Sequence, residues 1–328
     1  MIENRATYMK LIVMIPAYNE ATRIGNVIGA VPKEIPPFEK TVTLIVDDGS
    51  NDQTSEAARA AGGDKVLTHS VNLGVGAAFR TGLEEALRLG ADVIVNIDGD
   101  EQFDASEIPR LIKPIVDQTA DCVVGSRFLQ GSEIAGIPRW KRFGNAAFTG
   151  LVNWLTNSTL TDTQSGFRAY SREAALRLNL FGRFTYTQES LIDLIHKGQR
   201  VSEIPVAVRY DPARRSRVVG SIWTYGLRAA AAILRTIRDL KPLAFFGLAG
   251  AVISLAGAVT GLFVLVNWIL TGATSPYRSL VDASVVLLTI GSLTVFLGLT
   301  ADMIGRQKKT NEEILYLLKK REYSKTET

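Results

Sequence analysis

Two long stretches without any charged side chain constrain this chain more than any other feature of its sequence. They run from Pro242 to Tyr277 and from Ala283 to Ala301. As a helix, the apolar part of the first is roughly 42 Å long, and the second, about 28 Å long, is just sufficient to cross a hydrocarbon core. We therefore predict a two-helix membrane hairpin over residues 242–305, the alternative being two buried core helices of a large soluble protein.

Basic residues on either side of these stretches predict how the hairpin is oriented. Arg235, Arg238 and Lys241 precede the first stretch, and Arg306 and Lys309 follow the second. Because cytoplasmic flanks carry the excess of lysine and arginine, both ends of the hairpin are expected in the cytoplasm. The first ten residues are too polar for a signal peptide. We thus expect an integral membrane protein, in the plasma membrane of a prokaryote, whose N-terminal domain is cytoplasmic.

The remaining segments divide around this hairpin. Residues 1–225 form the predicted soluble domain, 226–241 a basic amphipathic helix on the membrane surface, and 306–328 a cytoplasmic tail. The tail contains a short amphipathic helix over 311–321, and the hairpin contains a Gly257-x-x-x-Gly261 pair. Both features are compatible with a homo-oligomer. The single cysteine, Cys122, excludes an intrachain disulfide and fits a reducing compartment.

Apolar runs alternate with helical patterns through the first half of the chain. Strands are predicted at Leu11–Ile15, Thr43–Val46 and Val93–Ile97, and helices lie between them, as at Arg23–Val31 and Val75–Leu89. Such alternation is typical of an α/β fold with a mainly parallel sheet covered on both faces. Ligands of these sheets bind at the carboxyl ends of the strands, so the residues that follow each strand are the candidates for a site.

Four polar or glycine-rich loops follow four of the predicted strands. They are residues 16–20, 47–52, 72–76 and 98–102. Each alone has a purely structural explanation as a turn or a helix cap, but four at one sheet edge are difficult to explain in that way. A dinucleotide-binding site is disfavoured, because no glycine-rich turn follows the first strand.

The chemistry of these loops suits a nucleotide diphosphate and a divalent cation. The Asp48 carboxylate can accept hydrogen bonds from a base or a ribose, and the turn at Gly74 lets backbone amides approach a phosphate at a helix N-terminus. Asp98, Asp100 and Gln102 supply hard oxygen atoms for Mg²⁺ or Mn²⁺ on diphosphate oxygens. These residues predict a metal-dependent nucleotide site.

Together the motifs resemble a known family. The runs PAYNE, VDDGSNDQT, NLGVGAAFRTG and IDGDEQF are similar to those of glycosyltransferase family 2, which has the GT-A fold. The runs VGSR, ending at Arg127, and TDTQSGFR, ending at Arg168, together with two C-terminal spans, resemble the polyprenyl-phosphate glycosyltransferases. That group includes the dolichyl-phosphate mannose synthases and glucosyltransferases. The resemblance implies that a nucleotide sugar and a polyprenyl or dolichyl phosphate are the two substrates.

The resemblance also implies roles for individual residues. The nucleotide would be held by Pro16, Tyr18, Glu20, Asp48 and Asp98, and the metal by Asp98, Asp100 and Gln102. Arg127 would contact the acceptor phosphate, and Arg142 and Asn145 are the nearest equivalents of a basic residue and a serine on the next helix. Ser216 and Arg217 stand in a loop expected to close over the donor, with Arg214 and Arg215 as nearby candidates.

The sequence motifs indicate the donor sugar less clearly than they indicate the family. Phe103 stands where the mannose synthases more often have histidine, and this slightly favours UDP-glucose or UDP-N-acetylglucosamine over GDP-mannose. A phosphate acceptor is already anionic near neutral pH and needs no base. We therefore expect inverting displacement, with Glu189 orienting groups. His69 and His196 lie outside the motifs and are predicted to be structural.

Other functions fit the sequence less well. A processive polysaccharide synthase carries Gln-x-x-Arg-Trp, but Gly136 stands where that glutamine is required. A non-catalytic membrane adaptor that only binds a nucleotide sugar is disfavoured by the Asp98/Asp100 pair and by Arg127. The basic segment 209–241 borders the membrane, where it would attract anionic lipid, and no stacking platform for a nucleic acid is evident.

Overall fold

The computed structural model describes residues 9–130, 134–135, 139–180, 186–209, 238 and 241–324. The chain forms two compact units, one comprising Met1–Arg215 with Leu315–Thr328 and the other Ser216–Ile314. The predicted surface helix over 226–241 lies outside the described residues, except for Arg238 and Lys241. The predicted loop residues also lie outside them: Arg214, Arg215, Ser216 and Arg217.

A seven-stranded sheet forms the centre of the first unit, in the order β3-β2-β1-β4-β7-β5-β8. Its strands are β1 (Met9–Ala17), β2 (Phe38–Asp47), β3 (Lys65–Thr68), β4 (Val93–Asn96), β5 (Cys122–Ser126), β7 (Arg168–Ser171) and β8 (Val201–Pro205). All pairings are parallel except those of β7, which runs antiparallel to both β4 and β5. The predicted α/β fold with a mainly parallel sheet is thus confirmed.

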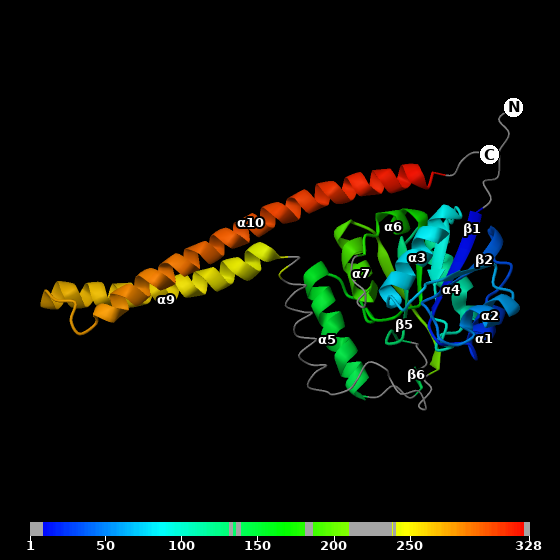
Figure 1. Cartoon of the computed structure of the whole chain (residues 1–328), viewed down its shortest axis with the longest axis horizontal. Helices are drawn as coiled ribbons and strands as arrows, with labels where there is room; N and C mark the ends of the chain where they lie inside the picture. The colour runs from blue at the N-terminus through cyan, green and yellow to red at the C-terminus, as the bar shows by residue number, and fades with distance from the viewer. Residues whose placement is uncertain are drawn as a thin grey trace. The chain divides into compact units, whose positions relative to one another are not determined.

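Helices cover both faces of this sheet (Figure 1). On one face lie α1 (Ile24–Ala30), α2 (Thr54–Ala60) and α4 (Ile108–Val116), and on the other lie α3 (Val75–Arg88), α6 (Arg172–Arg177) and α7 (Tyr186–His196), with α5 (Arg139–Thr156) against α7. Successive side chains of β1 enter opposite cores: Leu11 and Val13 pack in the first, Ile12 and Met14 in the second. The continuous apolar runs therefore reflect a sheet buried on both faces.

Two short strands extend the edge at which the loops gather. β6 (Ile134–Ala135) pairs in parallel with β9 (Val208–Arg209), and Phe103 forms an isolated bridge to Val208. The η1 turn (Ala105–Glu107) follows, and its start is capped by Asp104, which accepts from the Ser106 amide at 2.9 Å. The bridge from Phe103, with the Arg209 amide donating to the Gln102 carbonyl at 3.0 Å, thereby joins the segment after Asp98–Gln102 to β9.

The described part of the second unit contains two long helices, α9 (Pro242–Thr271) and the greater part of α10 (Arg278–Glu322). Both are long and apolar enough to cross a membrane. α10 continues without a break through residue 305, where the predicted hairpin ends. Ion pairs between residues four apart, Arg306 with Asp302 across this point and Lys308 with Glu312 beyond it, support a continuous helix.

Small residues let α9 and α10 approach closely. A Cβ atom added at Gly250 would lie 2.7 Å from the Gly291 carbonyl oxygen, and one at Gly257 would lie 2.9 Å from the Leu288 amide nitrogen. Gly261 faces Ser284 in the same way, at 3.3 Å. The Gly257/Gly261 pair, which the sequence offers for self-association, therefore serves a contact within the chain.

The C-terminal end of α10 belongs to the first unit and packs against its helices. Tyr316 and Tyr323 are buried in the core that contains α3, α6 and α7. The Tyr316 hydroxyl donates to Glu173 at 3.0 Å, and Lys319 donates to the Leu178 carbonyl at 2.8 Å. The amphipathic pattern at 311–321, interpreted above as a segment for self-association, is thus accounted for by this contact within the chain.

Candidate active site

The loops after β1 and β2 are joined by hydrogen bonds that include backbone amides. The Asn19 amide donates to Ser50 Oγ at 2.9 Å, and the Asn51 amide donates to Asn19 Oδ1 at the same distance. The Glu20 amide donates to Thr54 Oγ1 at 2.9 Å. The predicted nucleotide residues therefore lie together at the carboxyl edge of the sheet: Pro16 at the end of β1, and Tyr18, Glu20 and Asp48 in the two loops that follow β1 and β2.

Asp48 is buried at this edge, and its carboxylate holds the next loop. Oδ1 accepts from the Leu73 amide at 3.0 Å, and Oδ2 accepts from the Gly74 amide at 2.8 Å. Gly74 adopts a φ of 94°, a conformation that favours glycine, and α3 begins at the next residue. The structure thus brings Asp48 and Gly74 together as predicted, and it gives Asp48 a loop-holding contact that the sequence did not indicate.

His69 also lies at this edge, although the sequence motifs leave it outside the site. Its Nδ1 lies 2.7 Å from Asp48 Oδ1, and its Nε2 lies 3.0 Å from Thr81 Oγ1. The signal for it was available, because His69 directly follows β3 and so lies at the same edge as the four loops.

Asp98 and Asp100 follow β4, as the motif predicts. A Cβ atom added at Gly166 would lie 2.5 Å from Asp98 Oδ2, so only glycine lets the backbone of the 161–167 loop come this near the carboxylate. Gln102 donates to Asp100 through its amide nitrogen at 3.1 Å and its side chain at 2.8 Å. Gln102 therefore orients Asp100 in this arrangement, and its role as a metal ligand stays a prediction.

These oxygen donors fit a hard divalent cation that takes its other ligands from the substrate. Within the described ranges no three His, Cys, Asp or Glu side chains converge on one metal position. Mg²⁺ commonly binds through one or two carboxylates plus phosphate oxygens and water, which is what Asp98 and Asp100 offer. Phe103, at the end of this loop, is buried against Phe167 with ring centroids 5.4 Å apart, so it packs the loop.

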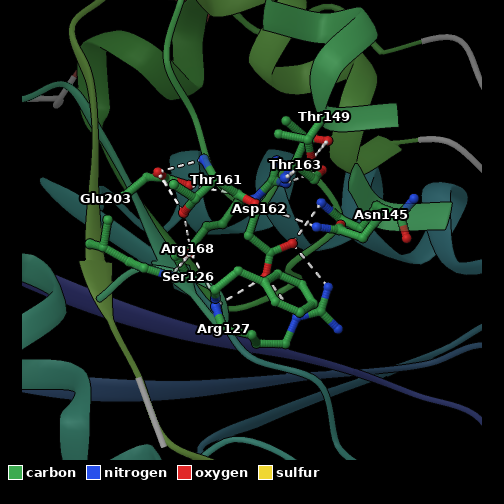
Figure 2. Close-up of polar contacts among 12 residues, drawn as sticks. Ser126, Arg127, Asn145, Thr149, Thr161, Asp162, Thr163, Arg168 and Glu203 are labelled. Carbon is green, nitrogen blue, oxygen red and sulfur yellow. Dashed lines mark hydrogen bonds and ion pairs between the residues drawn. The ribbon is translucent and has the colours of Figure 1, made fainter. Parts of the chain in front are cut away.

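Arg127 is held by a bidentate ion pair with Asp162 (Figure 2). Nε donates to Asp162 Oδ2 at 2.7 Å and Nη2 to Oδ1 at 3.0 Å, and the Arg127 amide donates to Oδ2 at 3.1 Å. Burial lowers the pKa of Arg127, but the hydrogen bonds and charge of Asp162, with the charge of Asp98, outweigh it and raise the pKa overall. The guanidinium is therefore a permanent cation near Asp98, partly neutralised by Asp162.

Glu203, on β8, supports the segment that carries Asp162. Its carboxylate accepts from the Thr161 and Asp162 amides at 2.8 and 2.9 Å and from Thr161 Oγ1 at 2.9 Å. Burial raises the pKa of Glu203 despite these hydrogen bonds, and the neighbouring charge of Asp162 raises it further. Ser126 Oγ lies 2.6 Å from Thr161 Oγ1, which connects the network to the last residue of β5, directly before Arg127 (Figure 2).

The two predicted site residues on α5, Arg142 and Asn145, differ in their surroundings. Asn145 is buried and donates to the Thr161 carbonyl at 3.4 Å, while its Oδ1 is buried without a hydrogen-bond partner among the described residues. Arg142 is exposed on the same helix. Asn145 thus belongs to the network around Arg127, whereas among the described residues Arg142 makes none of the contacts that build it.

Arg168 connects this network to the helix that carries Glu189. The side chain is fully buried, and it donates to Ser190 Oγ at 2.8 Å, to the Thr187 carbonyl, and to the Thr163 carbonyl at 2.9 Å. One guanidinium thus joins the 161–167 loop to the first turn of α7, in which Glu189 lies. The predicted participants Ser216 and Arg217 lie outside the described residues.

Taken together, the sheet and its loops define a glycosyltransferase with a GT-A-like fold. Residues 12–178, about half of the chain, match the family Glycosyl transferase family 2. The chain therefore belongs to glycosyl transferase family 2.

Two of the similar proteins are named as transferases of a sugar to a lipid phosphate. The chain is 33% identical over 221 residues to a UDP-N-acetylglucosamine–dolichyl-phosphate N-acetylglucosaminyltransferase of Methanococcus voltae, covering 61% of this chain and 86% of that one. It is 28% identical to an undecaprenyl-phosphate mannosyltransferase of Micrococcus luteus, covering 65% and 89%. In fold it resembles glucosyl-3-phosphoglycerate synthase of Mycobacterium tuberculosis, crystallised with Mn²⁺ and UDP, with a TM-score of 0.52, 21% identity and coverage of 70% and 78%.

Proposed function

We propose that this protein transfers a hexose from a nucleotide sugar to the phosphate of a polyprenyl or dolichyl lipid, with inversion at the anomeric carbon. The observation that carries the proposal is that the 161–167 loop contacts both a fixed cation and the acidic loop: Asp162 pairs with Arg127, and Gly166 lies directly against the Asp98 carboxylate. The lipid-phosphate acceptors named for the relatives from M. voltae and M. luteus support the choice of acceptor.

Two anions must meet in this reaction, the acceptor phosphate and the diphosphate of the donor. A bound Mg²⁺ or Mn²⁺, held by Asp98 and Asp100 with Gln102 beside them, would supply positive charge for the departing diphosphate. Arg127 supplies the fixed cation on the acceptor side, and Arg142 and Arg217 are proposed to add to it. The protein thus contributes placement and charge neutralisation, because the phosphate nucleophile is already ionised.

Glu189 is proposed to orient groups at the reacting centre. Its place in the first turn of α7, two residues after the Thr187 carbonyl that Arg168 holds, gives it a fixed backbone position. A base is not required for a phosphate acceptor, so Glu189 has no proton to remove in this scheme.

A UDP-linked donor is proposed, with glucose or N-acetylglucosamine as the sugar. The donor of the M. voltae relative and the phenylalanine at position 103 favour it. The mannosyltransferase among the relatives makes GDP-mannose the second candidate. We further propose that the two apolar helices anchor the protein in a prokaryotic plasma membrane, with the catalytic domain on the cytoplasmic side where nucleotide sugars are made.

The full chain, purified in detergent, tests the proposal directly. Polyprenyl phosphate and Mn²⁺ or Mg²⁺ are supplied with labelled UDP-glucose, UDP-N-acetylglucosamine or GDP-mannose, and label that enters the organic phase is counted. We expect label from one donor, lost with chelator and with Asp100→Ala. Asp117→Ala, an exposed carboxylate at the end of α4 that pairs with Lys113, is the matched control and should keep full activity.

The outcomes separate the alternatives. Label from GDP-mannose alone would replace the UDP donor by the mannosyl one. Lipid-phase label from no donor, in protein that still binds a nucleotide sugar, would overturn the lipid acceptor. Activity that survives both chelator and Asp100→Ala would overturn the metal role of the acidic loop.

A further inference from the structure

The geometry points to His69 as a positioning residue for the nucleoside diphosphate: we propose that it holds Asp48 so that Asp48 fixes the Leu73–Gly74 loop at the nucleotide-binding edge. The inference rests on the proposed function, because that function identifies the ligand of this edge. It assigns a role to a histidine that the sequence motifs leave outside the site.

His69 is fixed from both sides of its ring. Nδ1 lies 2.7 Å from Asp48 Oδ1 at the end of β2, and Nε2 lies 3.0 Å from Thr81 Oγ1 on α3. Its backbone amide donates to the Asp47 carbonyl at 2.9 Å. With only 12% of its side chain exposed, the ring is held by two elements and by its own strand end.

Hydrogen-bond chemistry fixes the direction of the contact with Asp48. A carboxylate only accepts, so Nδ1 carries the hydrogen, and in the neutral ring Nε2 then accepts from the Thr81 hydroxyl. Asp48 Oδ1 accepts from both His69 and the Leu73 amide, while Oδ2 accepts from the Gly74 amide. Without His69, a carboxylate that is 4% exposed loses one of three donors, which is unfavourable for a buried charge.

The loop held in this way leads into the helix N-terminus whose backbone amides are proposed to face the ligand. Leu73 and Gly74 lead directly into α3, whose first-turn amides form the positive end of a helix of fourteen residues. The loop also packs tightly on the loop after β2, since a Cβ atom at Gly49 would lie 2.5 Å from the Val71 carbonyl carbon. A displaced Asp48 would therefore shift the amides at the edge where a diphosphate binds.

Two substitutions of similar size distinguish the contact that Nδ1 makes with Asp48 from the contact that Nε2 makes with Thr81. In His69→Asn the amide nitrogen can take the place of Nδ1 and keep the bond to Asp48. In His69→Gln the amide reaches towards Thr81 and the bond to Asp48 is lost. Thr81→Val removes the partner of Nε2 alone and is the matched control.

We expect His69→Gln to raise the KM for the nucleotide sugar and the Kd for UDP about 10-fold, as for loss of one hydrogen bond to a charged group, with kcat nearly unchanged. His69→Asn should restore both constants to within about twofold, and Thr81→Val should change them as little. Equal effects of the Asn and Gln variants, or a fall in kcat at unchanged KM, would overturn the positioning role.

Hydrogen–deuterium exchange of the Leu73 and Gly74 amides tests, without any substrate, whether His69 and Asp48 hold this loop; we call this contact the His69–Asp48 clamp. His69→Gln should speed exchange at these amides, and His69→Asn should not. Protein that shows this pattern but binds no nucleotide sugar would overturn the proposed function and leave the clamp intact. Unchanged exchange in His69→Gln would overturn the clamp, and Asp48→Asn provides the same exchange test if the glutamine variant does not fold.

Discussion

Arg127 and Asp162 form a bidentate ion pair, with nitrogen–oxygen distances of 2.7 and 3.0 Å, across 35 positions of sequence. The carboxylate is completely buried and the guanidinium mostly so. The pairing restricts the arginine to one orientation, because two parallel hydrogen bonds fix the plane of its guanidinium. Arg127 is thus a preorganised cation, and Asp162 is the residue that sets its position.

Asp162→Asn should therefore impair turnover more than donor binding. The amide retains one acceptor oxygen, so the second bond to Arg127 is lost and the guanidinium is free to turn. We expect kcat to fall about 100-fold, the size of a lost charge-stabilising contact, with a smaller change in the KM for the nucleotide sugar. Steady-state kinetics with the lipid acceptor measures both. Asp117→Asn is the surface control, and wild-type kcat in Asp162→Asn would contradict the role given to the pair.

Glu189→Gln distinguishes orientation from proton transfer. The substitution keeps the size of the side chain and its hydrogen-bonding capacity but removes the base. If Glu189 only orients groups, activity should fall less than about 10-fold, since general-base catalysis typically contributes more than that. Turnover and UDP binding are measured on the same preparation. Complete loss of turnover with intact binding would indicate general-base chemistry, and hence a hydroxyl acceptor in place of a phosphate.

The single cysteine reports whether the central sheet is intact. Cys122 is fully buried on β5, and burial raises the pKa of its thiol to about 12. A raised pKa keeps the thiol protonated at pH 8, and the thiolate is the form that reacts. We expect iodoacetamide to leave the folded protein unlabelled at pH 8 and to label it once it is denatured, as followed by mass spectrometry. Rapid labelling of active protein would show that β5 opens in the folded state.

Local sequence pattern predicted much of the first unit. The apolar runs predicted β1, β2 and β4, and the helical patterns predicted α1 and α3, because these signals lie within each segment and do not depend on distant residues. The loops at Asp48 and Asp98 were predicted from local sequence as well, because residues that directly follow a parallel strand lie at the carboxyl edge of the sheet.

Contacts between distant segments could not be predicted in this way. The antiparallel β7 enters between β4 and β5, and a short run beginning at Arg168 carries no sign of that position. The support of Asp162 by Glu203 depends on β8 pairing with β5, which no local pattern reveals. His69 was missed because a lone histidine after a short strand has the composition of an ordinary structural residue.

The docking of the C-terminal helix end on α6 yields the last prediction. Tyr316 is 6% exposed, its ring lies 4.0 Å from the Arg177 guanidinium, and its hydroxyl donates to Glu173 at 3.0 Å. Tyr316→Phe removes only the hydrogen bond and should destabilise the docked segment by about 1 kcal/mol. Tyr316→Ala also removes the buried ring and the cation–π contact, and should cost about 3 kcal/mol.

Limited proteolysis of the full chain in detergent measures this docking, because cleavage near residue 320 requires the segment to detach. We expect the cleavage rate to increase from wild type through Tyr316→Phe to Tyr316→Ala. Leu317→Ala, one position along the same helix and 56% exposed, removes apolar surface that the domain does not cover and should leave the rate unchanged. Equal rates for Tyr316→Ala and Leu317→Ala would mean that this contact does not hold the helix end to the catalytic domain.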